Sequence, residues 1–135
     1  AVAQMLKEFK IGPMFGMGGF QLLPFYDAAR RLGLEHFLIN DERCGAFAAD
    51  AYAKVTGRIG VCDATLGPGA TNLITGIACS FFDSIPTIHL TGQVNQNEKE
   101  IYKGAKVRQA GFQQTYIVEM VKPITKYSVQ VTSAE

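Results

Sequence analysis

The feature that most constrains this fold is a strand, turn and helix pattern that occurs twice in succession between Glu35 and Gly92. A short apolar run, residues 36–39, precedes an acidic turn and an alanine-rich segment that ends at Gly57. A second apolar run, residues 59–66, leads into a glycine-rich loop and another apolar segment. Strands that alternate with helices through short connections predict a parallel sheet.

The rest of the chain continues this alternation. Helical spacing predicts a surface helix over residues 1–10 and a second helix over residues 22–32, which ends at Gly33. Further expected elements are strands over residues 11–15, 87–91 and 127–131 and a helix over residues 112–121. The sequence therefore predicts an α/β fold with a doubly wound, mainly parallel sheet and helices on both faces.

Two helices carry most of the apolar pattern. In the alanine-rich helix, Phe47, Ala51 and Val55 fall on one face. The helix after the glycine-rich loop is apolar on nearly every side, which predicts that it lies under other structure. Its expected buried residues are Leu73, Ile74, Ile77, Ala78, Phe81 and Phe82.

Loops rich in glycine or acidic residues follow the expected strands, at Gly16, Asp41, Gly67 and Gly92. In open α/β sheets the carboxyl ends of parallel strands gather at one edge, where ligands bind. Asp41 is a plausible helix N-cap, which places Glu42 in the first helical turn at this edge. On position alone, Glu42 is either a ligand-binding carboxylate or an acid that complements the helix dipole, and the second is the more common case.

Composition narrows the class of protein. A chain of 135 residues with 47% hydrophobic content is the size of one domain with a real core. A net charge of +1, with both signs mixed along the chain, argues against nucleic acid or a membrane surface as a partner. Three cysteines without CxxC spacing indicate reduced packing residues in a cytoplasmic protein and no metal site.

The segment from Asn95 to Gly111 is polar and charged, which predicts a solvated loop or short helix. The alternative is a ligand-binding basic patch formed by Lys99, Lys103, Lys106 and Arg108.

Familiar catalytic and phosphate-binding patterns do not fit. The loop Gly67-Pro68-Gly69-Ala70-Thr71-Asn72 lacks the Gly-Lys-Ser/Thr of a Walker A loop and only half-matches the dinucleotide fingerprint, which leaves an NAD domain as a weak alternative. There is no GxSxG elbow for a nucleophile. His36 and His89 lie inside strand-like runs, which favours a packing role for both.

Several motifs together resemble the thiamine diphosphate enzymes. Residues 42–57, ERCGAFAADAYAKVTG, resemble the helix that begins with their catalytic glutamate. Residues 64–72, ATLGPGATN, followed by DSIP at 83–86 and TGQV at 91–94, resemble the acetolactate synthase (acetohydroxyacid synthase) branch. Gly111-Phe112-Gln113 and residues 124–127 have counterparts there as well. The resemblance covers nearly the whole chain and implies the pyrimidine-binding domain of such an enzyme.

The resemblance implies a definite chemistry. Thiamine diphosphate loses a proton from C2 of its thiazolium ring to its own aminopyrimidine, and a carboxylate bonded to N1′ of that ring favours the imino tautomer that takes the proton. By resemblance, Glu42 is that carboxylate, and Phe112 and Gln113 face the reacting 2-oxo acid, such as pyruvate. Cofactor contacts are assigned in the same way to Glu42, Pro68, Gly69, Asn72, Gly19 and Gln113, and a substrate pocket to Phe20 and Phe112.

The chain departs from the acetolactate synthase pattern in its first glycine loop, where Gly18 takes the place of a proline and Phe20 that of a glycine. Asp41 and Leu66 replace the usual His and Ser. A bulky Phe20 beside the reacting carbon is expected to alter substrate choice, so acetolactate formation in branched-chain amino acid biosynthesis is the nearest assignment among thiamine-dependent lyases and decarboxylases.

The family holds the cofactor diphosphate through Mg²⁺ on a second domain with a G-D-G motif, which this sequence does not contain. The resemblance implies that residues 1–135 are a piece or one subunit of a larger enzyme. Its expected partner is the diphosphate-binding domain of a neighbouring subunit in a homo-oligomer, and FAD is implied only for a middle domain of the full enzyme. The alternative is a non-catalytic module that retains the fold.

Overall fold

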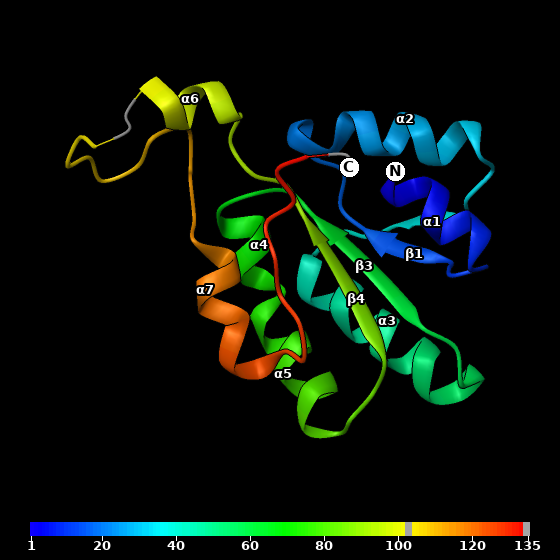
Figure 1. Ribbon diagram of the computed structural model, residues 1–135. Coiled ribbons are helices and arrows are strands. Elements are labelled where there is room, and N and C mark those ends of the chain that lie inside the picture. Colours follow the sequence, from blue (N-terminus) through cyan, green and yellow to red (C-terminus); the bar gives the residue numbers. More distant parts are fainter. Residues whose placement is uncertain (102–103, 134–135) are drawn as a thin grey trace.

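The computed structural model describes residues 1–101 and 104–133, with a four-stranded sheet at its centre (Figure 1). The strands are β1 (Met14–Gly16), β2 (His36–Leu38), β3 (Gly60–Ala64) and β4 (Thr87–Thr91), in the order β2-β1-β3-β4. All three pairings are parallel. The doubly wound α/β fold predicted from the alternating pattern is confirmed.

Helices cover both faces of the sheet (Figure 1). On one face, α1 (Val2–Glu8) and α2 (Leu23–Arg31) pack on Met14 and Val61. On the other, α3 (Glu42–Thr56) and α5 (Ile74–Phe82) pack on Cys62 and Ala64. The shorter helices are α4 (Pro68–Asn72), α6 (Gln96–Ile101) and α7 (Ile117–Val121), with 3₁₀ turns η1 (Phe20–Leu22) and η2 (Lys122–Ile124).

Helix α3 begins and ends as its sequence predicts. The side chain of Asp41 accepts a hydrogen bond from the backbone N–H of Arg43 at 2.9 Å, which is an N-cap. Gly57 ends the helix in the left-handed conformation, with φ of 67°. Glu42 therefore lies in the first turn of α3, just beyond the carboxyl end of β2.

The apolar face predicted for α3 is exposed. Phe47, Ala51 and Val55 do share one face, but it points to the surface, and Val55 is 86% exposed. The face turned to the sheet carries small residues instead, namely Gly45, Ala46, Ala49 and Ala53. Small side chains let the helix axis approach the sheet closely, and this requirement outweighs the burial of the larger side chains at 47 and 55.

Helix α5 is only partly buried, contrary to the sequence prediction. Leu73, Gly76, Ile77 and Ser80 are buried, whereas Phe82 is 74% exposed and Phe81 43% exposed. Other boundaries also differ. The first strand, β1, occupies residues 14–16 rather than 11–15, and β3 occupies residues 60–64 rather than 59–66. The glycine-rich loop becomes α4 after Gly67.

The C-terminal part departs most from the predicted elements. The helix expected over residues 112–121 begins at Ile117, because Gln113 has a φ of 53°, which a right-handed helix cannot contain. The strand predicted over residues 127–131 does not form. Residues 128–130 instead line a surface cavity with α7, and the segment runs beside α7 rather than joining the sheet (Figure 1).

The polar segment from Asn95 to Gly111 contains the short helix α6, one of the two forms predicted. Lys103, a member of the alternative basic patch, lies outside the described residues, and the side chain of Lys99 is not described. Within residues 1–101 and 104–133, no helix combines the length and apolarity needed to cross a membrane.

Candidate functional site

Glu42 is the central residue of the predicted ligand edge. Its side chain is buried, with 9% of its surface exposed, and its Oε2 atom accepts a hydrogen bond from Nδ2 of Asn72 at 2.9 Å. Asn72 is the last residue of α4, so this contact joins the start of α3 to the loop that follows β3. The structure thereby brings together two residues that the sequence analysis assigned to one site.

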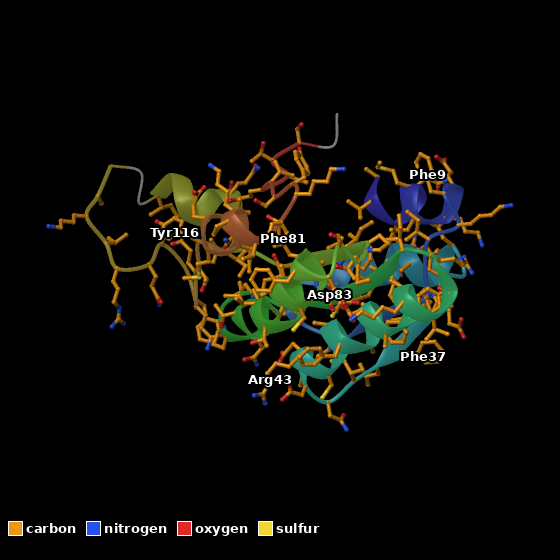
Figure 2. The ribbon with its side chains drawn as sticks, turned by 90° about the horizontal axis from the view of Figure 1, so that it is seen from below. Phe9, Phe37, Arg43, Phe81, Asp83 and Tyr116 are labelled. Atoms are coloured by element: carbon orange, nitrogen blue, oxygen red, sulfur yellow. The ribbon has the colours of Figure 1, made fainter. Side chains whose placement is uncertain are left out.

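The charge of Glu42 is not neutralised by a side-chain cation. Its neighbour Arg43 pairs with Asp41 at 2.6 Å, and this pair lowers the pKa of the Asp41 carboxyl to about 2. Arg43 lies at the periphery of the molecule in Figure 2. Among the ion pairs of the described residues, none includes Glu42. The amide of Asn72 and the positive end of the α3 dipole stabilise this buried carboxylate.

Gly69 leaves room beside the carboxylate. A Cβ atom at this position would lie 3.1 Å from Oε1 of Glu42 and 2.7 Å from Cγ2 of Thr65. Gly67, with φ of 60°, is covered by Gln113, whose backbone O would lie 2.8 Å from an added Cβ. Glycine is therefore required at both positions of this loop, because other atoms lie too close for a side chain. Such glycines are expected where the backbone must lie against a ligand or another segment.

The first glycine loop contacts the same edge. Gly19 lies against Thr65, so closely that an added Cβ would overlap the threonine side chain. The hydroxyl of Thr65 donates to Oε1 of Gln21 at 2.7 Å, and Gln21 also packs on Gly92 after β4. Thr65 and Gln21 thus connect the loops after β1, β3 and β4 at the carboxyl edge of the sheet. These two residues were not identified from the sequence.

The remaining predicted residues lie at the surface of this edge. Phe20 is 77% exposed and Phe112 is 73% exposed. Pro68, the first residue of α4, is also exposed. Two surface cavities of about 280 and 440 Å³ lie elsewhere, lined by residues of α7 and of the opposite sheet edge. In this chain the predicted substrate residues border open surface rather than an enclosed pocket.

Metal ligands and reactive thiols are not grouped at the edge. Across the described ranges 1–101 and 104–133, no three His, Cys, Asp or Glu side chains are placed to hold a metal ion. All three cysteines are free, and burial, with the charges of Asp63 and Glu42, raises the pKa of the Cys62 thiol to about 12. Cys62 is consequently a neutral packing residue, as predicted. The same prediction is wrong for Cys44, which is exposed because it lies on the surface side of α3, and Cys79 is partly buried.

The two histidines occupy strands, as predicted. His36 lies on β2, and its Nε2 is 2.8 Å from Oδ1 of Asp63. His89 lies on β4, with its Nε2 3.2 Å from Oγ1 of Thr87. Its buried Nδ1 has no hydrogen-bond partner among the described residues, and burial lowers the pKa of His89 to about 4. Asp63 was not singled out from the sequence, although one aspartate inside a fully buried strand is itself a signal of a specific partner.

Comparison with known proteins identifies the fold. Residues 1–120 match the family described as thiamine pyrophosphate enzyme, N-terminal TPP binding domain. The chain belongs to this family. Domains of this family bind thiamine diphosphate.

The relatives of this domain are acetolactate synthase-like. This chain is 41% identical over 135 residues to the acetolactate synthase large subunit of Cyanidium caldarium, and the match covers 97% of this chain and 22% of that protein. The isozyme 2 large subunit of Escherichia coli is 40% identical over 134 residues, covering 99% and 23%. A probable large subunit of Methanocaldococcus jannaschii is 39% identical over 135 residues, covering 100% and 22%. The chain spans about a fifth of the length of these relatives.

Proposed function

We propose that this domain supplies the pyrimidine-binding half of a thiamine diphosphate-dependent 2-oxo acid carboligase or decarboxylase, and that Glu42 activates the cofactor. The observation that carries the proposal is the buried carboxylate of Glu42, held by Asn72 beside Gly69 at the carboxyl edge of the sheet. When bound, thiamine diphosphate would supply the electron-accepting chemistry for breaking and forming bonds next to a carbonyl.

In this proposal Glu42 accepts a hydrogen bond from a protonated ring nitrogen, N1′ of the aminopyrimidine. Oε2 already accepts from Asn72, which fixes the plane of the carboxylate and leaves Oε1, beside Gly69, to face a ligand. Because the carboxylate is buried and has no cationic partner among the described ion pairs, its interaction with a positively polarised ring would be strong. A carboxylate in such a position would hold a proton at N1′ and so favour the imino tautomer, in which the exocyclic nitrogen has given up one proton and can accept another.

The residues around Glu42 fit a flat aromatic ring. Gly69 gives the ring room to lie against backbone, with Pro68 and Asn72 on either side of it in the sequence of α4. Gln113, over Gly67, would contact the cofactor or the 2-oxo acid, and Gly19, against Thr65, would border the thiazolium. Phe20 and Phe112 would exclude water from the reacting carbon once covered, which suits a pyruvate-like substrate and acetolactate synthase-like chemistry.

The site needs a second domain. Phe20 and Phe112 are largely exposed, as is Val55 on α3, and Phe47 of the same helix is partly exposed. Such a surface is expected of one half of an interface. The proposed partner is the diphosphate-binding domain of a neighbouring subunit, which would hold Mg²⁺, and FAD would belong to a middle domain if the full enzyme has one. Three free cysteines agree with a proposed cytoplasmic, homo-oligomeric enzyme.

The test replaces Glu42 by Gln in the full-length protein, or in this chain combined with its partner. Gln keeps the size and the contact with Asn72 but removes the negative charge. The rate of pyruvate consumption with thiamine diphosphate and Mg²⁺ is expected to fall roughly 10²–10⁴-fold. Calorimetry would show thiamine diphosphate binding to the intact protein.

The exposed residue Arg43 provides a matched control, because Arg43→Gln also changes one charge in the first turn of α3 but at the surface. It is expected to leave turnover within about twofold of the natural protein. Wild-type turnover in the Glu42→Gln protein, or no cofactor binding by the intact protein, would overturn the proposal and leave a fold retained for another purpose.

A further inference from the structure

A second polar cluster lies on the other face of the sheet, under α2. Asp63 of β3 is fully buried, and its two carboxylate oxygens have separate partners. Oδ1 is 2.8 Å from Nε2 of His36 on β2, and Oδ2 accepts from the hydroxyl of Tyr26 on α2 at 2.7 Å. Because a carboxylate can only accept, His36 must carry a proton on Nε2. The rings of Tyr26 and His36 also lie against each other, with centroids 5.5 Å apart.

This cluster crosses the sheet. The strand order places β1 between β2 and β3, and Gly16 of β1 is the residue in register with Asp63. A Cβ atom at Gly16 would overlap the carboxyl group of Asp63. The aspartate therefore reaches from β3 to β2 through the space that the missing side chain of Gly16 provides.

The strand that receives this contact is weakly held. β2 is an edge strand of three residues, and its Leu38 is 74% exposed. Among the described residues, the hydrogen bonds of residues 35–40 run to β1, at Met14 and Gly16, except the bond from His36 to Asp63. His36 thus adds a side-chain bond from β2 past β1 to β3, beside the backbone bonds between β2 and β1.

Two chain segments start from this connection and meet again at the proposed site. After His36, β2 leads through residues 39–41 into Glu42 at the start of α3. After Asp63, β3 leads through residues 65–67 into α4, which ends at Asn72. The segments are joined at their base by the His36–Asp63 contact of 2.8 Å and at their ends by the Asn72–Glu42 bond of 2.9 Å.

We propose that His36, Asp63 and Tyr26 form a positioning network that holds β2, and with it Glu42, in register with the loop carrying Gly69 and Asn72. The inference rests on the proposed role of Glu42 and deepens it, because it names what places that carboxylate. In this proposal the three residues act through β2 and Glu42 and have no assigned contact with the cofactor or the substrate. Burial, together with the hydrogen bond and charge of Asp63, raises the pKa of the Tyr26 hydroxyl, so Tyr26 is a neutral donor to Asp63.

The test compares two substitutions of His36 in the full-length protein. His36→Leu removes the donor, and His36→Gln keeps an N–H group near the position of Nε2. Turnover of pyruvate at saturating thiamine diphosphate and Mg²⁺ should fall roughly 10–100-fold in His36→Leu, since displacement of a catalytic group by about 1 Å has effects of this size. His36→Gln should recover most of the loss. The Michaelis constant for pyruvate should change little, because no substrate contact is removed.

Tyr26→Phe and Tyr52→Phe form a matched pair of controls. Each deletes one hydroxyl, but Tyr52 bonds to the backbone O of Gly12 at 2.9 Å, at the opposite edge of the sheet. Both substitutions should lower the melting temperature, and only Tyr26→Phe should lower turnover. If His36→Leu is too unstable to purify, the turnover of Tyr26→Phe tests the network instead. Full turnover in folded His36→Leu or Tyr26→Phe would overturn the network. If Glu42→Gln is inactive while these variants are normal, only this inference fails; normal turnover in Glu42→Gln overturns the proposed function itself.

Discussion

At the scale of single residues, this domain buries several charged or titratable groups, and each has different hydrogen-bond partners. Glu42 is stabilised by an amide and a helix N-terminus, and Asp63 by two side-chain donors. Asp50, buried on α3, is bonded to Ser80 at 2.8 Å and to Lys54 at 2.8 Å. His89 is the exception, because its buried Nδ1 has no hydrogen-bond partner in the part of the chain that the structure describes.

The burial of His89 predicts a pH dependence of stability. Its pKa is lowered from 6.5 to about 4 in the folded chain, so the unfolded chain binds the proton first as pH falls. Stability should therefore be complete above pH 6.5 and decline between pH 6.5 and 4, by up to roughly 3 kcal/mol.

Urea unfolding of the chain at pH 7 and at pH 4.5 measures this decline. His89→Leu removes the titrating group and should reduce the difference between the two pH values. An equal decline in the natural and substituted chains would show that other groups cause it.

At the scale of helices and strands, α3 and α5 pack closely against each other. Gly76 of α5 lies directly on Ala46 of α3, and an added Cβ would overlap that of Ala46. Gly76→Ala should destabilise the chain by about 1–3 kcal/mol through overpacking, despite the better helix propensity of alanine.

Thr75→Ala, at the exposed neighbouring position, should change stability by less than about 0.5 kcal/mol. The free energies of unfolding from denaturant titrations provide the comparison. A stabilised Gly76→Ala chain would mean that α3 and α5 separate easily.

What could be predicted at this scale depended on how local the cause was. The N-cap at Asp41 and the end of α3 at Gly57 follow from neighbouring residues, and both were predicted. The buried face of α3 was not, because it depends on how closely the sheet and α5 approach. The strand expected over residues 127–131 has the right alternation but does not pair with an edge strand of the sheet, and it packs along α7 instead.

The candidate site divides in the same way. Glu42 and Asn72 were assigned together through motif resemblance, and their contact is observed. Asp63, Thr65 and Gln21 were missed, because their roles come from side chains 27 to 44 positions away in the sequence. Only the presence of a charge inside a buried strand marked Asp63 in advance.

At the scale of the whole molecule, the exposed apolar side chains of α3 predict association. Phe47 is 43% exposed and Val55 is 86% exposed, on a helix next to the proposed site. Because contiguous apolar surface favours contact between molecules, the 135-residue chain should form dimers or larger species at micromolar concentration.

Sedimentation equilibrium tests this expectation. Replacing Phe47 and Val55 together by Glu should shift the chain toward monomer. Met5→Glu introduces a charge at an exposed apolar position of α1, on the opposite face of the sheet, and should leave association unchanged. A natural chain that is monomeric at all concentrations would contradict this role for the α3 surface.

The passage of Asp63 over Gly16 also limits how this domain can change in evolution. A side chain at position 16 is excluded while the aspartate is present, and a shorter residue at position 63 would leave His36 and Tyr26 without their acceptor. Each single step is therefore expected to be harmful. An alanine at 16 becomes acceptable only in a sequence that has already given up the carboxylate, so substitutions at these two positions should show strong epistasis and occur in a fixed order.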